Sequence, residues 1–134
     1  MEVARSPLRL PNIIRISGAK VVSGRGRGRT IGIPTINVEP TSVPPSLARG
    51  IYACTIRIGA ETFAGALHYG PRPAFNDTET MEIHVIDAEV KTVTPTVDLA
   101  LVAFLRGVEN FPDVESLKKA IAGDIEAARA MLAA

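Results

Sequence analysis

Short apolar runs, separated by turn residues, fill the chain up to about residue 110. Runs that are rich in β-branched residues and bounded by Gly, Pro, Asn or Asp are typical of β-strands. We therefore predict strands over residues 13–22, 51–58, 63–69, 81–90 and 97–105. Pro11 and Pro95 fit at strand entries or edges, where a missing N–H does no harm. Residues 39–45, with three prolines, predict a loop.

The spacing of apolar residues changes after residue 112 to steps of three and four. Asp113 is a suitable N-cap. It precedes an apolar stripe at helical spacing, made of Val114, Leu117, Ile121, Ile125 and Ala128. The stripe predicts one amphipathic helix that docks on the strands. Several short strands followed by a terminal helix, without βαβ alternation, favour an all-β fold in which an antiparallel sheet closes on itself.

Composition limits the size and class of the protein. A chain of 134 residues with 46% hydrophobic content forms one domain with a sizeable core. Its formal net charge of +1 argues against a surface built for nucleic acid. An apolar run of transmembrane length and the hydrophobic core of a signal peptide are both missing, so we expect no membrane contact. The single Cys54 lies in an apolar run and predicts a buried thiol in a reducing compartment, so we expect a cytoplasmic protein. We also expect a monomer.

Residues 24–37 carry the clearest chemical signal, because a flexible cationic segment is joined there to a stiff turn. Glycines let successive backbone N–H groups converge on an anion, and arginines add charge-assisted donors. The segment predicts a phosphate-binding site made of Gly24, Arg25, Gly26, Arg27, Gly28, Arg29, Gly32, Pro34, Thr35 and Asn37. Thr35 and Asn37, two residues apart in an extended segment, point to the same side and can both reach a Mg²⁺ ion.

The Gly/Arg segment also has other interpretations. Its spacing matches neither the P-loop nor the dinucleotide-binding pattern. Gly/Arg repeats occur in plain surface loops and in segments that bind single-stranded RNA. Barrels that bind single strands normally stack bases on aromatic side chains, and the Gly/Arg run has none. The Asn37 side chain can also close a local turn over residues 34–37 through its own backbone.

Several further motifs follow the Gly/Arg segment in order. They are Arg49-Gly50-Ile51-Tyr52, Met81-Glu82-Ile83-His84, Leu105-Arg106 through Asn110-Phe111, and Gly123-Asp124-Ile125 after Glu115-Ser116-Leu117. Together with residues 24–37 this order resembles the riboflavin kinase family, over about residues 18–131. The resemblance implies a six-stranded antiparallel Greek-key β-barrel with the C-terminal α-helix packed on it. It also implies a single kinase domain over residues 1–134, with residues 1–12 as an N-terminal extension.

The resemblance implies a reaction as well: transfer of the γ-phosphate of ATP to the terminal ribityl hydroxyl of riboflavin, giving FMN and ADP, with Mg²⁺. The roles implied are catalytic base for Glu82, metal ligands for Thr35 and Asn37, and substrate contacts for His84, Arg106 and Phe111. Strand alternation alone also allows a plainer interpretation. In that case Glu82 and His84 form the solvent side of an amphipathic strand.

The sequence departs from the family's usual pattern at several positions, among them two motifs that carry polar side chains. His68-Tyr69-Gly70 stands where many bacterial members have Asn-Ile-Gly, and Pro73-Ala74-Phe75 replaces Pro-Thr-Phe. A barrel that binds flavin or nucleotide without catalysis is therefore an alternative. Bacterial members usually carry an adenylyltransferase domain before the kinase. Because few residues precede Gly18, we expect a kinase module that does not make FAD by itself.

Overall fold

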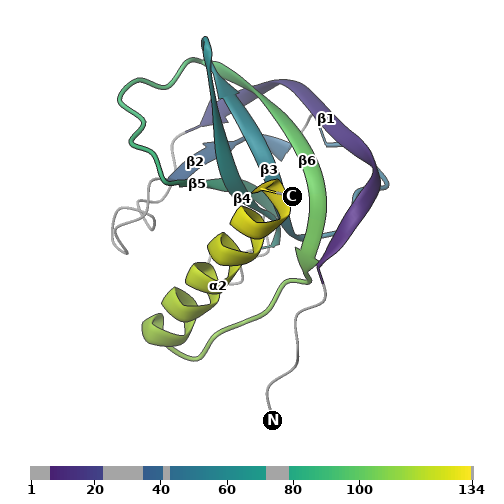
Figure 1. The fold of residues 1–134 in the computed structure, drawn as a ribbon, viewed down its shortest axis with the longest axis vertical. Coiled ribbons are helices and arrows are strands. Elements are labelled where there is room, and N and C mark those ends of the chain that lie inside the picture. Colours follow the sequence, from purple (N-terminus) through teal and green to yellow (C-terminus); the bar gives the residue numbers. More distant parts are fainter. Residues whose placement is uncertain (1–6, 23–34, 41–42, 72–78, 134) are drawn as a thin grey trace.

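The structure is a computed structural model and describes residues 7–22, 35–40, 43–71 and 79–133 (Figure 1). Its elements are β1 Leu8–Val22, β2 Thr35–Val38, β3 Gly50–Ile58, β4 Glu61–Pro71, β5 Glu79–Ile86, β6 Thr96–Arg106 and α2 Val114–Ala133. All five strands predicted from apolar runs are present. The extended segment that was expected to carry the metal ligands forms the sixth, β2.

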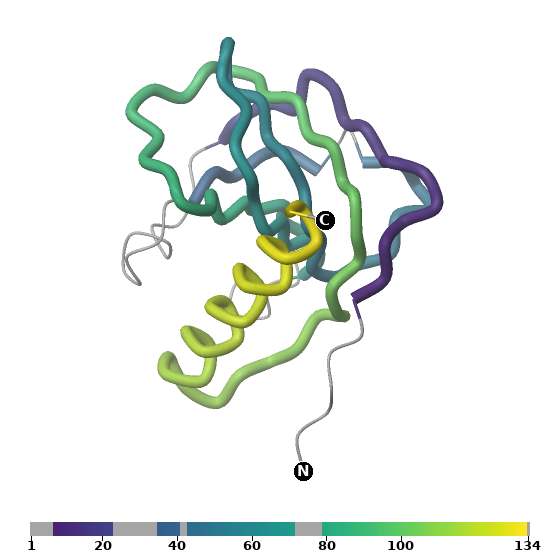
Figure 2. Tube along the Cα trace, viewed as in Figure 1, coloured from purple at the N-terminus to yellow at the C-terminus, as the bar shows by residue number. Residues whose placement is uncertain are grey.

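The six strands form a closed barrel in the order β1-β2-β5-β4-β3-β6, and each neighbouring pair is antiparallel. β3, β4 and β5 are successive neighbours. β6 then returns after a longer connection to lie beside β3, which is a Greek-key arrangement. Figure 2 shows α2 running along the outside of this barrel. The predicted six-stranded antiparallel barrel with a packed C-terminal helix is confirmed.

Strand β1 begins earlier than predicted, at Leu8 instead of residue 13. Residues 8–12, which we expected in the N-terminal extension, therefore belong to the sheet. Pro11 is accommodated because the pairing of β1 with β6 shifts register between Arg9 and Ile14. A proline at such an irregularity removes no ladder hydrogen bond.

Strand β5 ends earlier than predicted, at Ile86 instead of residue 90. The next residue, Asp87, adopts a φ of 54°. This left-handed conformation is incompatible with a continuing strand, so the chain leaves the sheet there. The following strand starts at Thr96, one residue before the predicted start, and Pro95 lies at its entry, as predicted.

Buried apolar side chains form two clusters, one inside the barrel and one beneath α2. All six strands contribute to the inner cluster, for example through Ile16, Ile36, Cys54, Leu67, Ile83 and Leu101. Ala128 of α2 joins the outer cluster, which takes from the strands Ile51, Ala53, Ala66, Ile86, Ala103 and Leu105. Cys54 is fully buried as predicted, and burial raises the pKa of its thiol to about 12. A thiol in this state is inert.

Helix α2 begins at the predicted cap. The backbone N–H of Ser116 donates to Asp113 Oδ1 at 2.7 Å, and this bond holds the pKa of Asp113 below its usual value. Two residues of the predicted apolar stripe, Ile121 and Ala128, are buried. Val114 is exposed instead, because the first turn of α2 extends past the barrel (Figure 1).

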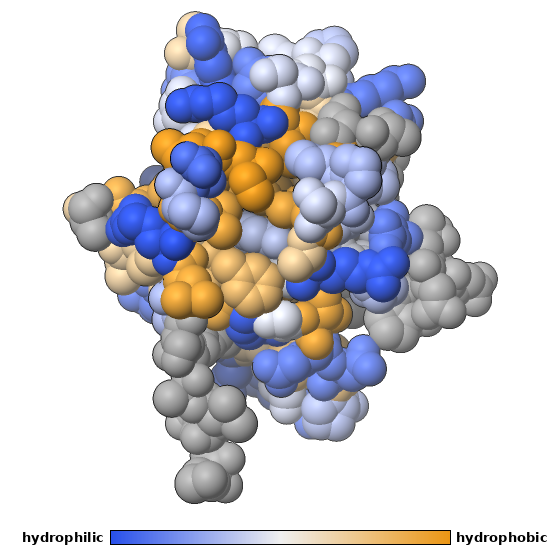
Figure 3. All heavy atoms as spheres, turned by 90° about the vertical axis from the view of Figure 1, so that its right-hand side faces the viewer, coloured by the Kyte–Doolittle hydropathy of each residue, from blue (hydrophilic) through white to orange (hydrophobic). Residues whose placement is uncertain are grey.

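The β1 side of the barrel carries an apolar patch (Figure 3). Leu8 and Ile13 are exposed there. A cavity of about 420 Å³ on the barrel is lined by Leu10, Ile14, Pro44, Ser46, Leu47, Ala48, Tyr52 and Phe104. These lining residues include none of the predicted site residues. Among the described residues, no helix has both the length and the hydropathy that a membrane crossing requires.

Gly65 of β4 provides a test of how tightly the barrel is packed. A Cβ at this position would lie 2.7 Å from Ile83 Cγ2 and 3.2 Å from Cys54 Sγ. We predict that Gly65→Ala lowers the free energy of unfolding by about 1–3 kcal/mol, the usual cost of overpacking. Gly107→Ala is the control, because a Cβ there meets no atom within 4 Å. Equal effects of both substitutions in urea unfolding would contradict the prediction.

Candidate active site

Strand pairing brings four of the predicted site residues onto one part of the barrel wall. In the β2–β5 pair, Thr35 lies opposite His84 and Asn37 lies opposite Glu82. Residues directly opposite one another in an antiparallel pair share a face of the sheet. The two predicted metal ligands therefore lie beside the predicted base, although the two motifs are far apart in the sequence.

Glu82 and His84 lie on the outer face of β5, yet both are buried. The alternating residues Met81, Ile83 and Val85 belong to the inner cluster, so Glu82 and His84 point away from it. Their exposed fractions are only 8% and 9%. The plainer interpretation, in which these two residues form a solvent-facing strand surface, is therefore wrong. Charged residues are seldom buried without a partner or a function.

A hydrogen bond joins the two motifs. Thr35 Oγ1 and His84 Nδ1 are 3.2 Å apart. When Nδ1 carries no proton, the Thr35 hydroxyl donates to it, and the lone pairs of the hydroxyl oxygen remain available to a cation. His84 in this arrangement orients a predicted metal ligand, and its direct contact with substrate stays a prediction.

His68 of β4 is the third member of a row that crosses three strands. It lies opposite Glu82 in the β4–β5 pair, on the other side from Asn37. Ala66 lies opposite His84 in the same pair. The sequence marked His68 as a departure from the family pattern but did not place it beside Glu82. The apolar alternation of the two strands, aligned with each other, is the signal that could have given the β4–β5 register and placed His68 beside Glu82.

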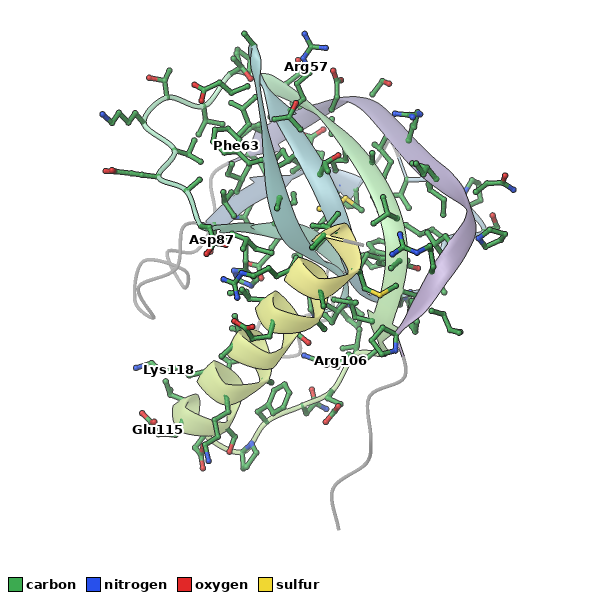
Figure 4. The ribbon with its side chains drawn as sticks, in the orientation of Figure 1. Arg57, Phe63, Asp87, Arg106, Glu115 and Lys118 are labelled. Carbon is green, nitrogen blue, oxygen red and sulfur yellow. The ribbon has the colours of Figure 1, made fainter. Side chains whose placement is uncertain are left out.

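Arg106 and Phe111 are the remaining predicted substrate contacts. Arg106 lies where β6 ends beside α2 (Figure 4). The Arg106 Cζ atom is 5.6 Å from the centre of the Phe111 ring. The guanidinium also makes two hydrogen bonds to Asp124 of α2, at 2.8 and 2.9 Å. Asp124 belongs to a family motif in the sequence but has no predicted role, because no local pattern shows which charged residue faces it.

Hydrogen bonds also link the first residue of β5 to the end of β4 and to the residue before β3. Glu79 accepts hydrogen bonds from Arg49 Nε at 2.6 Å and from the Tyr69 hydroxyl at 3.0 Å. Both hydrogen bonds lower the pKa of Glu79, and the bond from Arg49 has the larger effect. A carboxylate with a lowered folded-state pKa stabilises the fold above its unfolded-state pKa, and that stabilisation is lost as the pH falls through the folded-state value.

Most of the predicted phosphate-binding residues cannot be placed on this wall. Gly24, Arg25, Gly26, Arg27, Gly28, Arg29, Gly32 and Pro34 lie outside the described residues, and so does Ala74. Within the described ranges, no group of three or more His, Cys, Asp or Glu side chains could hold a metal ion. Thr35 and Asn37 supply a hydroxyl and an amide oxygen, which are hard donors of the kind that Mg²⁺ takes in small numbers beside water and phosphate.

The barrel with one helix on its outer wall is a known fold. It is similar to a Streptococcus pneumoniae structure described as a macrolide-efflux protein, with a TM-score of 0.68 over 92% of this chain and 38% of that one. The two sequences are 23% identical, so the likeness concerns the fold alone.

The chain belongs to the riboflavin kinase (flavokinase) family, whose sequence profile matches residues 10–132. It is 34% identical to the bifunctional riboflavin kinase/FMN adenylyltransferase of Haemophilus influenzae over 87% of this chain. Against the human riboflavin kinase the identity is 33%, over 84% of this chain and 77% of the human protein. The chain spans 38% of the length of the Haemophilus protein.

Proposed function

We propose that this chain transfers the γ-phosphate of ATP to the terminal ribityl hydroxyl of riboflavin, giving FMN and ADP. Membership of the family supports the proposal. The structural observation that carries it is the row formed by Asn37, Glu82 and His68 on three adjacent strands. The buried carboxylate of Glu82 lies in this row between Asn37, one of the two proposed metal ligands, on one side and β4, which packs against α2, on the other.

The order of the strands gives the site a direction. Thr35 and Asn37 lie on β2, Glu82 lies on β5, and His68 lies on β4. The Gly/Arg segment precedes β2 directly in the sequence, so we assign the β2 side to the triphosphate of ATP. The acceptor then approaches from the β4 side, beside α2. Glu82 lies between donor and acceptor, where a base must stand to take the proton of the attacking hydroxyl.

The reaction requires little covalent chemistry from the protein. The ribityl oxygen forms a bond to the γ-phosphorus as the bond from that phosphorus to the ADP oxygen breaks, and the hydroxyl proton passes to the Glu82 carboxylate. Positioning and charge stabilisation account for most of the acceleration in such transfers. A site walled by strands is suited to this task, because the paired backbones hold the side chains in place.

Thr35 and Asn37 are the residues that would hold Mg²⁺. Both offer neutral oxygens, and the bond of Thr35 to His84 keeps the hydroxyl oriented. When bound there, Mg²⁺ would supply positive charge against the negative charge that develops on the phosphate oxygens. A carboxylate one strand away then remains available for proton transfer.

The first test is the reaction itself. Purified protein is incubated with riboflavin, ATP and MgCl₂, and FMN and ADP are separated and quantified. We expect equal amounts of the two products. Riboflavin that binds but is not phosphorylated would refute the kinase proposal and favour a flavin-binding barrel without catalysis.

Replacement of both proposed metal ligands should affect the nucleotide more than the flavin. We predict that the double variant Thr35→Ala with Asn37→Ala loses affinity for MgADP, because two oxygen ligands are removed on the donor side. Riboflavin affinity should change little. Calorimetric titrations with each ligand check this. Thr62→Ala, an exposed position at the start of β4, is the control. Unchanged MgADP affinity in the double variant would remove the metal-ligand assignment.

Glu82→Gln tests the base directly. Glutamine keeps the size of the side chain and loses its basicity, so we predict that kcat falls by roughly 10²–10⁴-fold, the usual contribution of a positioned general base. Riboflavin affinity should stay near that of the wild type, because the shape of the site is preserved. Steady-state rates and fluorescence titrations measure the two effects. Glu61→Gln, on the exposed start of β4, is the matched control. A kcat within a few-fold of wild type would sink the assignment.

A further inference from the structure

We propose that the ion pair between Arg106 and Asp124 is a positioning device for the acceptor substrate. By fixing residues 107–111 next to the β4 side of the site, it sets how efficiently riboflavin is used. The inference rests on the proposed function. It gives Arg106 an indirect role, in place of the direct substrate contact that the resemblance implied.

The pair has a single well-defined geometry. Arg106 is the last residue of β6, and Asp124 lies in the middle of α2. Nε donates to Oδ1 at 2.8 Å and Nη2 donates to Oδ2 at 2.9 Å. The side chains are only 12% and 5% exposed. Two parallel bonds in a site shielded from solvent hold the guanidinium in a fixed position relative to the helix.

The guanidinium in turn holds the segment that follows β6. Its Nη1 donates to the carbonyl of Gly107 at 2.9 Å, and its Cζ lies 5.6 Å from the centre of the Phe111 ring. Val108 packs directly on Gly70 of β4, where an added Cβ would come within 2.9 Å of Val108 Cγ2. Residues 107–111 are therefore tied to the ion pair at both ends and to β4 in between.

The segment lies on the acceptor side of the site. Gly70 is two residues beyond His68 on the same face of β4, and His68 lies opposite Glu82. Thr35 and Asn37, assigned to the phosphate donor, lie on the other side of Glu82. A shift of residues 107–111 would therefore change the space next to the acceptor before it changed the donor side.

The chain contains a matched control pair. Arg129 and Asp87 also make two bonds, Nε to Oδ2 at 2.9 Å and Nη2 to Oδ1 at 2.7 Å, and they join α2 to the end of β5. Their side chains are 40% and 64% exposed. The two pairs have the same chemistry and anchor the same helix. They differ in burial and in the segment that the arginine contacts.

The test compares Asp124→Asn with Asp87→Asn in riboflavin phosphorylation. We expect kcat/KM for riboflavin to fall roughly 10–100-fold in Asp124→Asn, the scale of a small misplacement of a substrate. KM for ATP should stay within about twofold of wild type, and so should every constant of Asp87→Asn. Hydrogen exchange reports on the segment without any need for activity. The amides of residues 107–111 should exchange faster in Asp124→Asn but not in Asp87→Asn.

A double variant separates positioning from stability. Arg106→Met with Asp124→Leu replaces a buried pair by apolar side chains, which is often neutral or stabilising, but it removes the contacts to Gly107 and Phe111. We expect a Tm near that of wild type with the low kcat/KM of Asp124→Asn. Wild-type kcat/KM in the folded double variant, or equal losses in the two Asn variants, would overturn the inference. A wild-type protein that leaves riboflavin unchanged would instead refute the proposed function.

Discussion

The register between β5 and its two neighbours is the constraint on which the site depends. Side chains alternate across a strand, so a slip of one residue would turn Glu82 toward the barrel interior and expose its apolar neighbours. The inner cluster prevents this slip, because Met81 and Ile83 are fully buried between residues of the other strands. The same packing that stabilises the barrel therefore keeps the carboxylate on the outer wall.

Closure of the barrel gives this register its rigidity. β2 has only four residues, and a strand of that length would be weakly held at an open edge. In the closed barrel it is paired on both sides, with β1 and with β5. Thr35 and Asn37 thus lie on a supported strand, although the segment before β2 is rich in glycine. A site built on paired strands holds its geometry better than one built on a loop.

Helix α2 covers part of the outer wall of the barrel, mainly over β3, β4 and β6. The helix packs through small residues such as Ala128 on the outward faces of the strands. Two Arg–Asp pairs, one buried and one exposed, also join the helix to the barrel. The exposed pair with Asp87 is screened by water and contributes little to stability. In the buried pair, both charges lose hydration, so each depends on its partner and on the exact match of helix and strand. Such a pair specifies position more than it adds stability.

The sequence by itself determined five of the six strands, the helix with its Asp113 cap, the buried Cys54 and the motifs of the family, because alternation, helical spacing and turn residues are local properties of the chain. It did not indicate that β1 starts at Leu8 or that β5 ends at Ile86, since these ends depend on a register shift and on one backbone dihedral. Tertiary structure alone decided that His68 and Asn37 flank Glu82 and that Asp124 faces Arg106. These neighbours come from strand register and helix docking, which are set by packing between residues remote in the chain.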